Sequence, residues 1–138
     1  MNRQIGKTEI FEWYDGIVFG LASVENLQAL VCLLAFDPDA NRKLYLLASV
    51  SWEQADMLRK LFAEHGLTPF NNDLISNILI KSDEMHLTSS PLEEGKMAAL
   101  TPLTAIQRER LVPMSFPLID AAVSSRAISE WLGDKEPS

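Results

Sequence analysis

The sequence predicts an α+β fold in a single domain over residues 1–138: a four-stranded antiparallel meander packed against an amphipathic helix, then a C-terminal helical half. Residues 9–50 are rich in β-branched, aromatic and leucine side chains and are interrupted by turn residues, as short antiparallel strands are. From Ser51 onward, apolar residues recur mainly at helical spacing.

The meander is predicted from four segments. Residues 9–14 and 17–24 flank Asp15-Gly16, a dipeptide that tolerates positive φ and favours a two-residue hairpin turn. Residues 27–36 are almost continuously apolar, which indicates a strand covered on both faces. Residues 43–50 follow a proline-containing turn and complete the sheet.

The clearest predicted helix begins after Ser51. Ser51 and Gln54 have the spacing of a capping box, and Gly66 is a typical stop. One apolar stripe along this helix is predicted to pack on the sheet, and it comprises Trp52, Ala55, Leu58, Leu61 and Phe62. Trp52 begins this helix and Trp131 lies near the end of the last predicted helix, each on an apolar stripe. Both are therefore predicted to be core residues.

The second half of the chain is predicted to be mostly helical. Residues 71–81 fit a helix or an edge strand, and the helix is preferred. Residues 82–97 are predicted to be a long acidic loop. A helix capped by Thr101-Pro102 and ending before Pro113, a last helix over residues 115–133 and a frayed tail over residues 134–138 follow.

Charge and cysteine content limit the classes of function. Twelve Lys and Arg against nineteen Asp and Glu give a net charge of −7, which repels nucleic-acid backbones and favours a basic protein partner. Cys32 is the single cysteine and lies in an apolar run, so it is expected to be a core residue in a reducing, cytoplasmic environment. No apolar run has the roughly 18 residues of a membrane span.

Motifs of common catalytic sites do not occur in the sequence. There is no P-loop, dinucleotide fingerprint, nucleophile elbow or zinc-ligand spacing, so neither a cofactor nor a metal is expected. His65 and His86 are the two imidazoles. The last turn of the Ser51 helix explains His65. His86 is predicted to lie on the loop surface, where Asp83 and Glu84 would raise its pKa if they are close to it in space.

Two groups of residues are candidates for binding a partner. At the tip of the first hairpin, strand alternation puts Glu12 and Tyr14 on one face beside Asp15. If this face is exposed, an aromatic ring beside carboxylates suits a partner cation; if it is buried, Tyr14 is a core residue. The acidic loop supplies the second group, which comprises Asp83, Glu84, His86, Glu93 and Glu94.

The sequence therefore favours an acidic protein-binding domain, such as an immunity protein or an inhibitor that occludes a basic site on a toxin or a nucleic-acid enzyme. The alternative is a homo-oligomeric structural or regulatory adaptor, held together by a sheet edge or by the helix over residues 118–132. A small enzyme that uses a carboxylate and a histidine as acid and base is the least favoured hypothesis.

Overall fold

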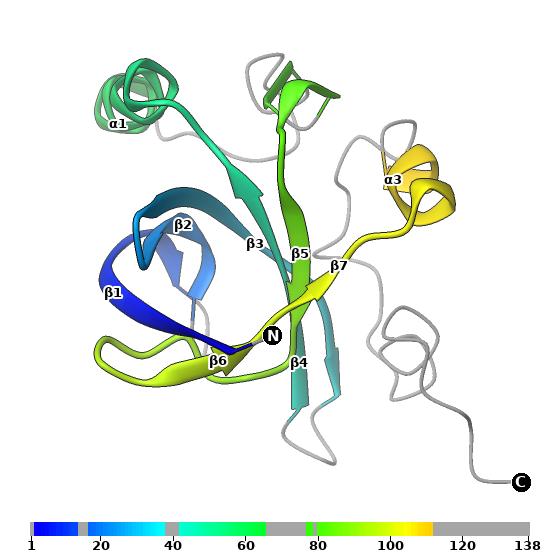
Figure 1. Cartoon of the computed structure of the whole chain (residues 1–138). Coiled ribbons are helices and arrows are strands. Elements are labelled where there is room, and N and C mark those ends of the chain that lie inside the picture. Colours follow the sequence, from blue (N-terminus) through cyan, green and yellow to red (C-terminus); the bar gives the residue numbers. More distant parts are fainter. Residues whose placement is uncertain (1, 14–16, 38–41, 66–76, 79, 112–138) are drawn as a thin grey trace, which may run out of the picture.

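The computed structural model describes residues 2–13, 17–37, 42–65, 77–78 and 80–111, and gives backbone alone for residues 12, 13, 17–19, 34–37, 42, 65 and 109–111 (Figure 1). The strands are β1 (Asn2–Trp13), β2 (Ile17–Val24), β3 (Leu27–Asp37), β4 (Arg42–Ser49), β5 (Met85–Thr88), β6 (Met97–Ala99) and β7 (Thr101–Pro102). The helices are α1 (Trp52–His65) and α3 (Ala105–Leu111). Helical backbone also occurs at residues 77, 78, 80 and 81, which agrees with the preferred helix in this region.

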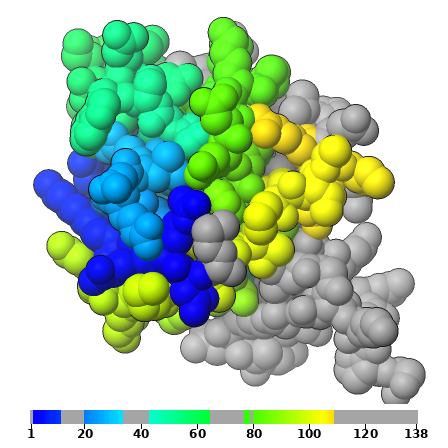
Figure 2. Space-filling model, in the orientation of Figure 1, coloured from blue at the N-terminus to red at the C-terminus, as the bar shows by residue number. Residues whose placement is uncertain are grey.

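The described strands form one antiparallel sheet in the order β6-β1-β2-β3-β4-β5-β7. β6 and β7 are separated along the chain only by Leu100, yet they lie at opposite ends of this order. Residues 97–99 pair with β1 and residues 101–102 pair with β5. This one segment joins the two ends of the sheet, which is consequently barrel-like and nearly closed (Figure 1). In Figure 2 the dark blue residues near the N-terminus lie against yellow-green residues of the segment that leads into this closure.

The predicted α+β fold, with four strands over residues 9–50 and a C-terminal helical half, is wrong. β1 begins at Asn2, and the predicted loop over residues 82–97 contains β5 and the start of β6. Thr101 and Pro102 form β7 instead of capping a helix. The predicted helix over residues 115–133 and the tail over residues 134–138 lie outside the described part of the chain.

Successive side chains of the central strands point to opposite faces of the sheet. Both faces are buried, because an apolar cluster lies on each of them. One cluster contains Val31 and Leu47 with Ala98 and Leu100 of the closing segment, and it forms the interior of the barrel-like sheet. The other cluster, on the outer face, combines strand leucines such as Leu30 with residues of α1. Burial on both faces confirms the prediction for residues 29–32 of β3.

α1 starts where the sequence predicts. Ser51 Oγ accepts a hydrogen bond from the Gln54 amide at 3.1 Å, and Gln54 Oε1 accepts one from the Ser51 amide at 2.9 Å, which completes the capping box. Ala55 and Leu58 are fully buried against the outer face of the sheet. Packing of this stripe fixes α1 beside the β2–β3 hairpin (Figure 1).

Candidate functional site

The hairpin-tip candidates are only partly described. Glu12 lies in β1 and its backbone pairs with Phe19 of β2, but the structure does not describe its side chain. Tyr14 and Asp15 lie outside the described residues. Partner binding through these three residues stays a prediction.

The four predicted acidic residues occupy two separate places in the chain. Asp83 and Glu84 precede β5, whereas Glu93 and Glu94 lie between β5 and β6, and all four are exposed. Basic side chains offset two of these charges: Glu84 Oε2 lies 3.4 Å from Arg3 Nη1, and Glu93 Oε2 lies 2.6 Å from Lys96 Nζ. Local ion pairs therefore reduce the negative field that the acidic segment presents to a partner.

His86 was predicted to be a surface residue of a loop. It lies instead in β5 and is only 6% exposed. It pairs with Leu47, whose side chain belongs to the interior cluster. Burial lowers the pKa of His86, the charge of Arg3 lowers it further, and Glu84 raises it less than these effects lower it. Glu84 raises the pKa, as expected of a nearby acid, but desolvation and the charge of Arg3 outweigh it, so the net shift is downward.

Cys32 lies in the outer apolar cluster and is 3% exposed, as the sequence predicts. Burial raises the pKa of its thiol to about 12. A thiol with this pKa carries almost no thiolate at neutral pH, so Cys32 is a packing residue in this fold.

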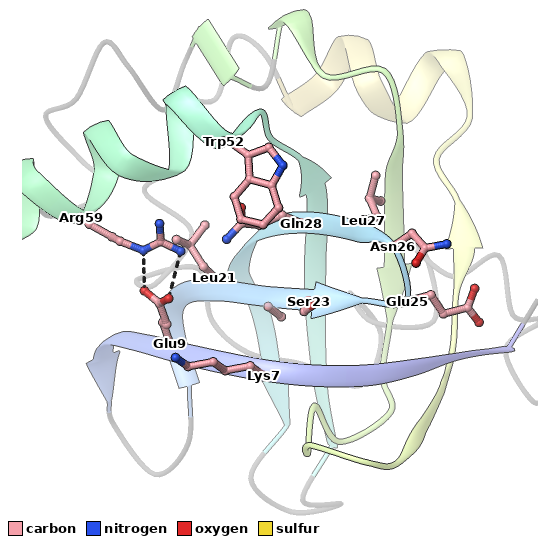
Figure 3. Close-up of a pocket in the computed structure, with 11 residues that line it drawn as sticks. Lys7, Glu9, Leu21, Ser23, Glu25, Asn26, Leu27, Gln28, Trp52 and Arg59 are labelled. Carbon is pink, nitrogen blue, oxygen red and sulfur yellow. Dashed lines mark hydrogen bonds and ion pairs between the residues drawn. The ribbon is translucent and has the colours of Figure 1, made fainter.

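A groove of about 500 Å³ lies on the outer face of the sheet, beside the first turn of α1. Its floor includes Ser23 and Gln28, which are paired neighbours on β2 and β3. Trp52 of α1 extends over this floor, and Glu25 lies at the hairpin end (Figure 3). On the outer face, the apolar cluster includes Leu21 and Leu30, whereas Ser23 and Gln28, two residues further toward the β2–β3 turn, are polar and line the groove.

An ion pair between α1 and β1 forms the other end of the groove (Figure 3). Arg59 Nε donates to Glu9 Oε2 at 2.8 Å, and Arg59 Nη2 donates to Glu9 Oε1 at 2.9 Å. Arg59 Nη1 also donates to Asp56 Oδ1 at 2.8 Å. The hydrogen bonds to Glu9 are the main cause that raises the pKa of Arg59, and the two-point pairing fixes the orientation of both side chains.

Trp52 was predicted to be a core residue and is instead 75% exposed. Trp52 is the first residue of α1. Viewed down the axis of an ideal helix, its position lies roughly 90° around from the centre of the buried stripe that contains Ala55 and Leu58. Gln28 lines the same groove (Figure 3), and its side-chain Oε1 is buried without a hydrogen-bond partner in the part of the chain that the structure describes. Sequence reasoning missed both features, although the position of Trp52 directly after the cap was a usable signal.

Metal ligands, membrane-spanning helices and similarity to known proteins place few constraints on the class of this protein. No group of three or more His, Cys, Asp or Glu residues suited to a metal ion occurs in the described ranges. None of the helices described is both long and apolar enough to cross a membrane. Comparisons with known protein families, with curated proteins and with solved structures find no match. The site is thus defined by its own geometry: a polar groove with an exposed indole above it.

Proposed function

We propose that this protein is a protein-binding domain, and that a segment of its partner occupies the groove beside Trp52. The observation that carries the proposal is the 75% exposure of Trp52 next to a concave surface. Tryptophan is the residue type most enriched among the side chains that dominate binding energy at protein interfaces. An exposed indole loses contact with water when a partner covers it, and this transfer favours binding.

The partner proposed is basic, and the binding acts by occlusion, as an inhibitor or an immunity protein does. The net charge of −7 supports this choice, because it speeds the encounter with a positively charged surface. Asp83 and Glu94, for which the described residues provide no ion pair, would contribute to steering. The unpaired, buried Cys32 supports a reducing, cytoplasmic compartment.

A matched pair of variants tests this proposal. Trp52→Ala removes the exposed indole, whereas Ile106→Ala removes a side chain that is 71% exposed on α3, away from the groove (Figure 1). Tagged wild-type protein and both variants are incubated with lysate of the source organism and washed at low and high salt, and bound proteins are quantified by mass spectrometry.

The expected result is a basic protein that wild type and Ile106→Ala retain, that Trp52→Ala loses, and that high salt weakens. With the purified partner, we expect Trp52→Ala to weaken binding at least tenfold, on the order of 1.4 kcal/mol or more. Identical recovery by wild type and Trp52→Ala would contradict the proposal, and so would recovery of the bait alone.

A homo-oligomeric adaptor is a second candidate, and one observation favours it. β6 pairs only with residues 2–4 of β1, so within the described ranges no strand pairs with the same edge of β1 over residues 6–10. Ile10 on this stretch is 44% exposed. Sedimentation equilibrium distinguishes the candidates, because self-association through this edge should be weakened by Ile10→Lys and not by Trp52→Ala.

A further inference from the structure

We infer that the group held in the groove is an arginine side chain of the partner, stacked on the Trp52 indole and donating a hydrogen bond to Gln28 Oε1. This inference rests on the proposed function and specifies the chemistry of its ligand. Three features of the groove support it: an unused acceptor, an exposed aromatic face and the distribution of charge.

The unused acceptor is Gln28 Oε1, which is buried without a hydrogen-bond partner. Buried polar atoms in folded proteins are nearly always paired, and an unpaired one destabilises the fold. Ser23, the cross-strand neighbour of Gln28, does not donate to it in the structure. A donor that arrives with a ligand would complete this site, so the ligand is expected to carry N–H groups.

The aromatic face belongs to Trp52, which lines the groove together with Gln28 (Figure 3). Because the indole is 75% exposed, it can tilt to admit a flat group beside the Gln28 amide. A guanidinium is planar, stacks on aromatic rings and carries five N–H donors. An ammonium group is compact and strongly hydrated, so lysine fits this site less well than arginine.

The charges along the groove favour a cation at one end of it. Glu25, at the hairpin turn, is exposed and forms no ion pair with the described residues. Among the described residues that line the groove, Glu25 is thus the one carboxylate outside the Glu9–Arg59 pair. Lys7 lies at the opposite end, near the Glu9–Arg59 pair (Figure 3), so the cation is placed between Trp52 and Glu25.

Three blocked tripeptides test the inference on the full chain: acetyl-Gly-Arg-Gly-amide, the same peptide with citrulline, and the same peptide with glutamate. Citrulline keeps the shape of arginine and removes its charge. Binding is followed by NMR, through the indole N–H of Trp52 and the backbone amides of Ser23 and Leu27. The indole signal is assigned with Trp52→Phe, because the chain contains two other tryptophans.

We expect saturable, millimolar binding of the arginine peptide, with the citrulline peptide about tenfold weaker. Gln28→Leu should weaken the arginine peptide severalfold and leave the fold at least as stable as wild type, because it removes an unpaired acceptor. Lys7→Ala is the matched control at the other end, and it should leave binding unchanged or slightly stronger.

Several results would overturn the inference: equal binding of the arginine and citrulline peptides, tighter binding of the glutamate peptide, no effect of Gln28→Leu, or no saturable shift at Trp52. The proposed function fails separately. If the arginine peptide does not bind but capture of a partner still depends on Trp52, the groove is the docking site and only the arginine assignment is wrong.

Discussion

Gly20 of β2 provides the sharpest test of the register that builds the groove. A Cβ atom at this position would lie 2.2 Å from the carbonyl oxygen of Glu9 on β1, whereas real Cβ atoms essentially never approach closer than 3.0 Å. Gly20→Ala therefore forces β1 and β2 apart by about 0.8 Å, the difference between these two distances. Because ladder hydrogen bonds hold neighbouring strands at a fixed spacing, this displacement weakens the pairing that positions Glu9 beside Arg59.

The expected cost combines overpacking with weakened ladder bonds, and we place it at about 3 kcal/mol. With an unfolding entropy of ~2.1 cal/mol/K per residue, a chain of this length should lose about 10 °C in Tm. Circular dichroism during thermal unfolding measures the change.

Gly95→Ala is the control for Gly20→Ala. Gly95 has φ +85 but no atom lies within 4 Å of its Cβ position, so its substitution costs backbone strain alone. This strain is about 1 kcal/mol, or about 3 °C. If Gly20→Ala is no more destabilising than Gly95→Ala, the close approach of β1 and β2 is refuted.

Three further predictions concern one ion pair and two buried ionisable side chains. A double-mutant cycle with Glu9→Gln and Arg59→Met, followed by urea unfolding, should give a coupling of about 1 kcal/mol, because the two-point pair is partly exposed; a coupling of zero argues against the pair. Because the pKa of His86 is lowered in the folded state, the unfolded state binds more protons near its own pKa of ~6.5. Stability should therefore be complete above this pH and decline as the pH falls through it, and His86→Gln should flatten the decline. Cys32 should resist DTNB at pH ~8 in the native protein and react fully in concentrated guanidinium chloride, since burial raises its pKa; rapid native labelling would contradict its burial.

Local sequence patterns predicted the central elements well. The bounds of β2 agree with the predicted strand at residues 17–24. β3 ends one residue later than predicted, and β4 begins and ends one residue earlier than predicted. The capping box at Ser51 correctly located the start of α1. These elements succeed because hydrophobic period, turn residues and caps are all encoded within a few neighbouring positions.

Closure of the sheet was not predictable in this way. It depends on β6 and β7, which have three and two residues, and on partners that lie far away in the sequence. A strand this short shows no period, and Pro102 at its end is typical of an edge or a helix start. His86 was misplaced for the same reason, because the four-residue β5 is surrounded by acids that suggested a loop.

The candidate site was missed because its residues violate the local rules that located the helix and strands. A core position would bury Trp52, and a purely structural role would give Gln28 Oε1 a donor, but the structure does neither. Departures from local consistency are expected where a surface is kept ready for a ligand, since such a surface reduces the stability of the free protein. The outer face could have been completed by an apolar residue at position 28. That this face ends instead in a polar groove beside an exposed indole is the physical reason to test this groove for the proposed partner.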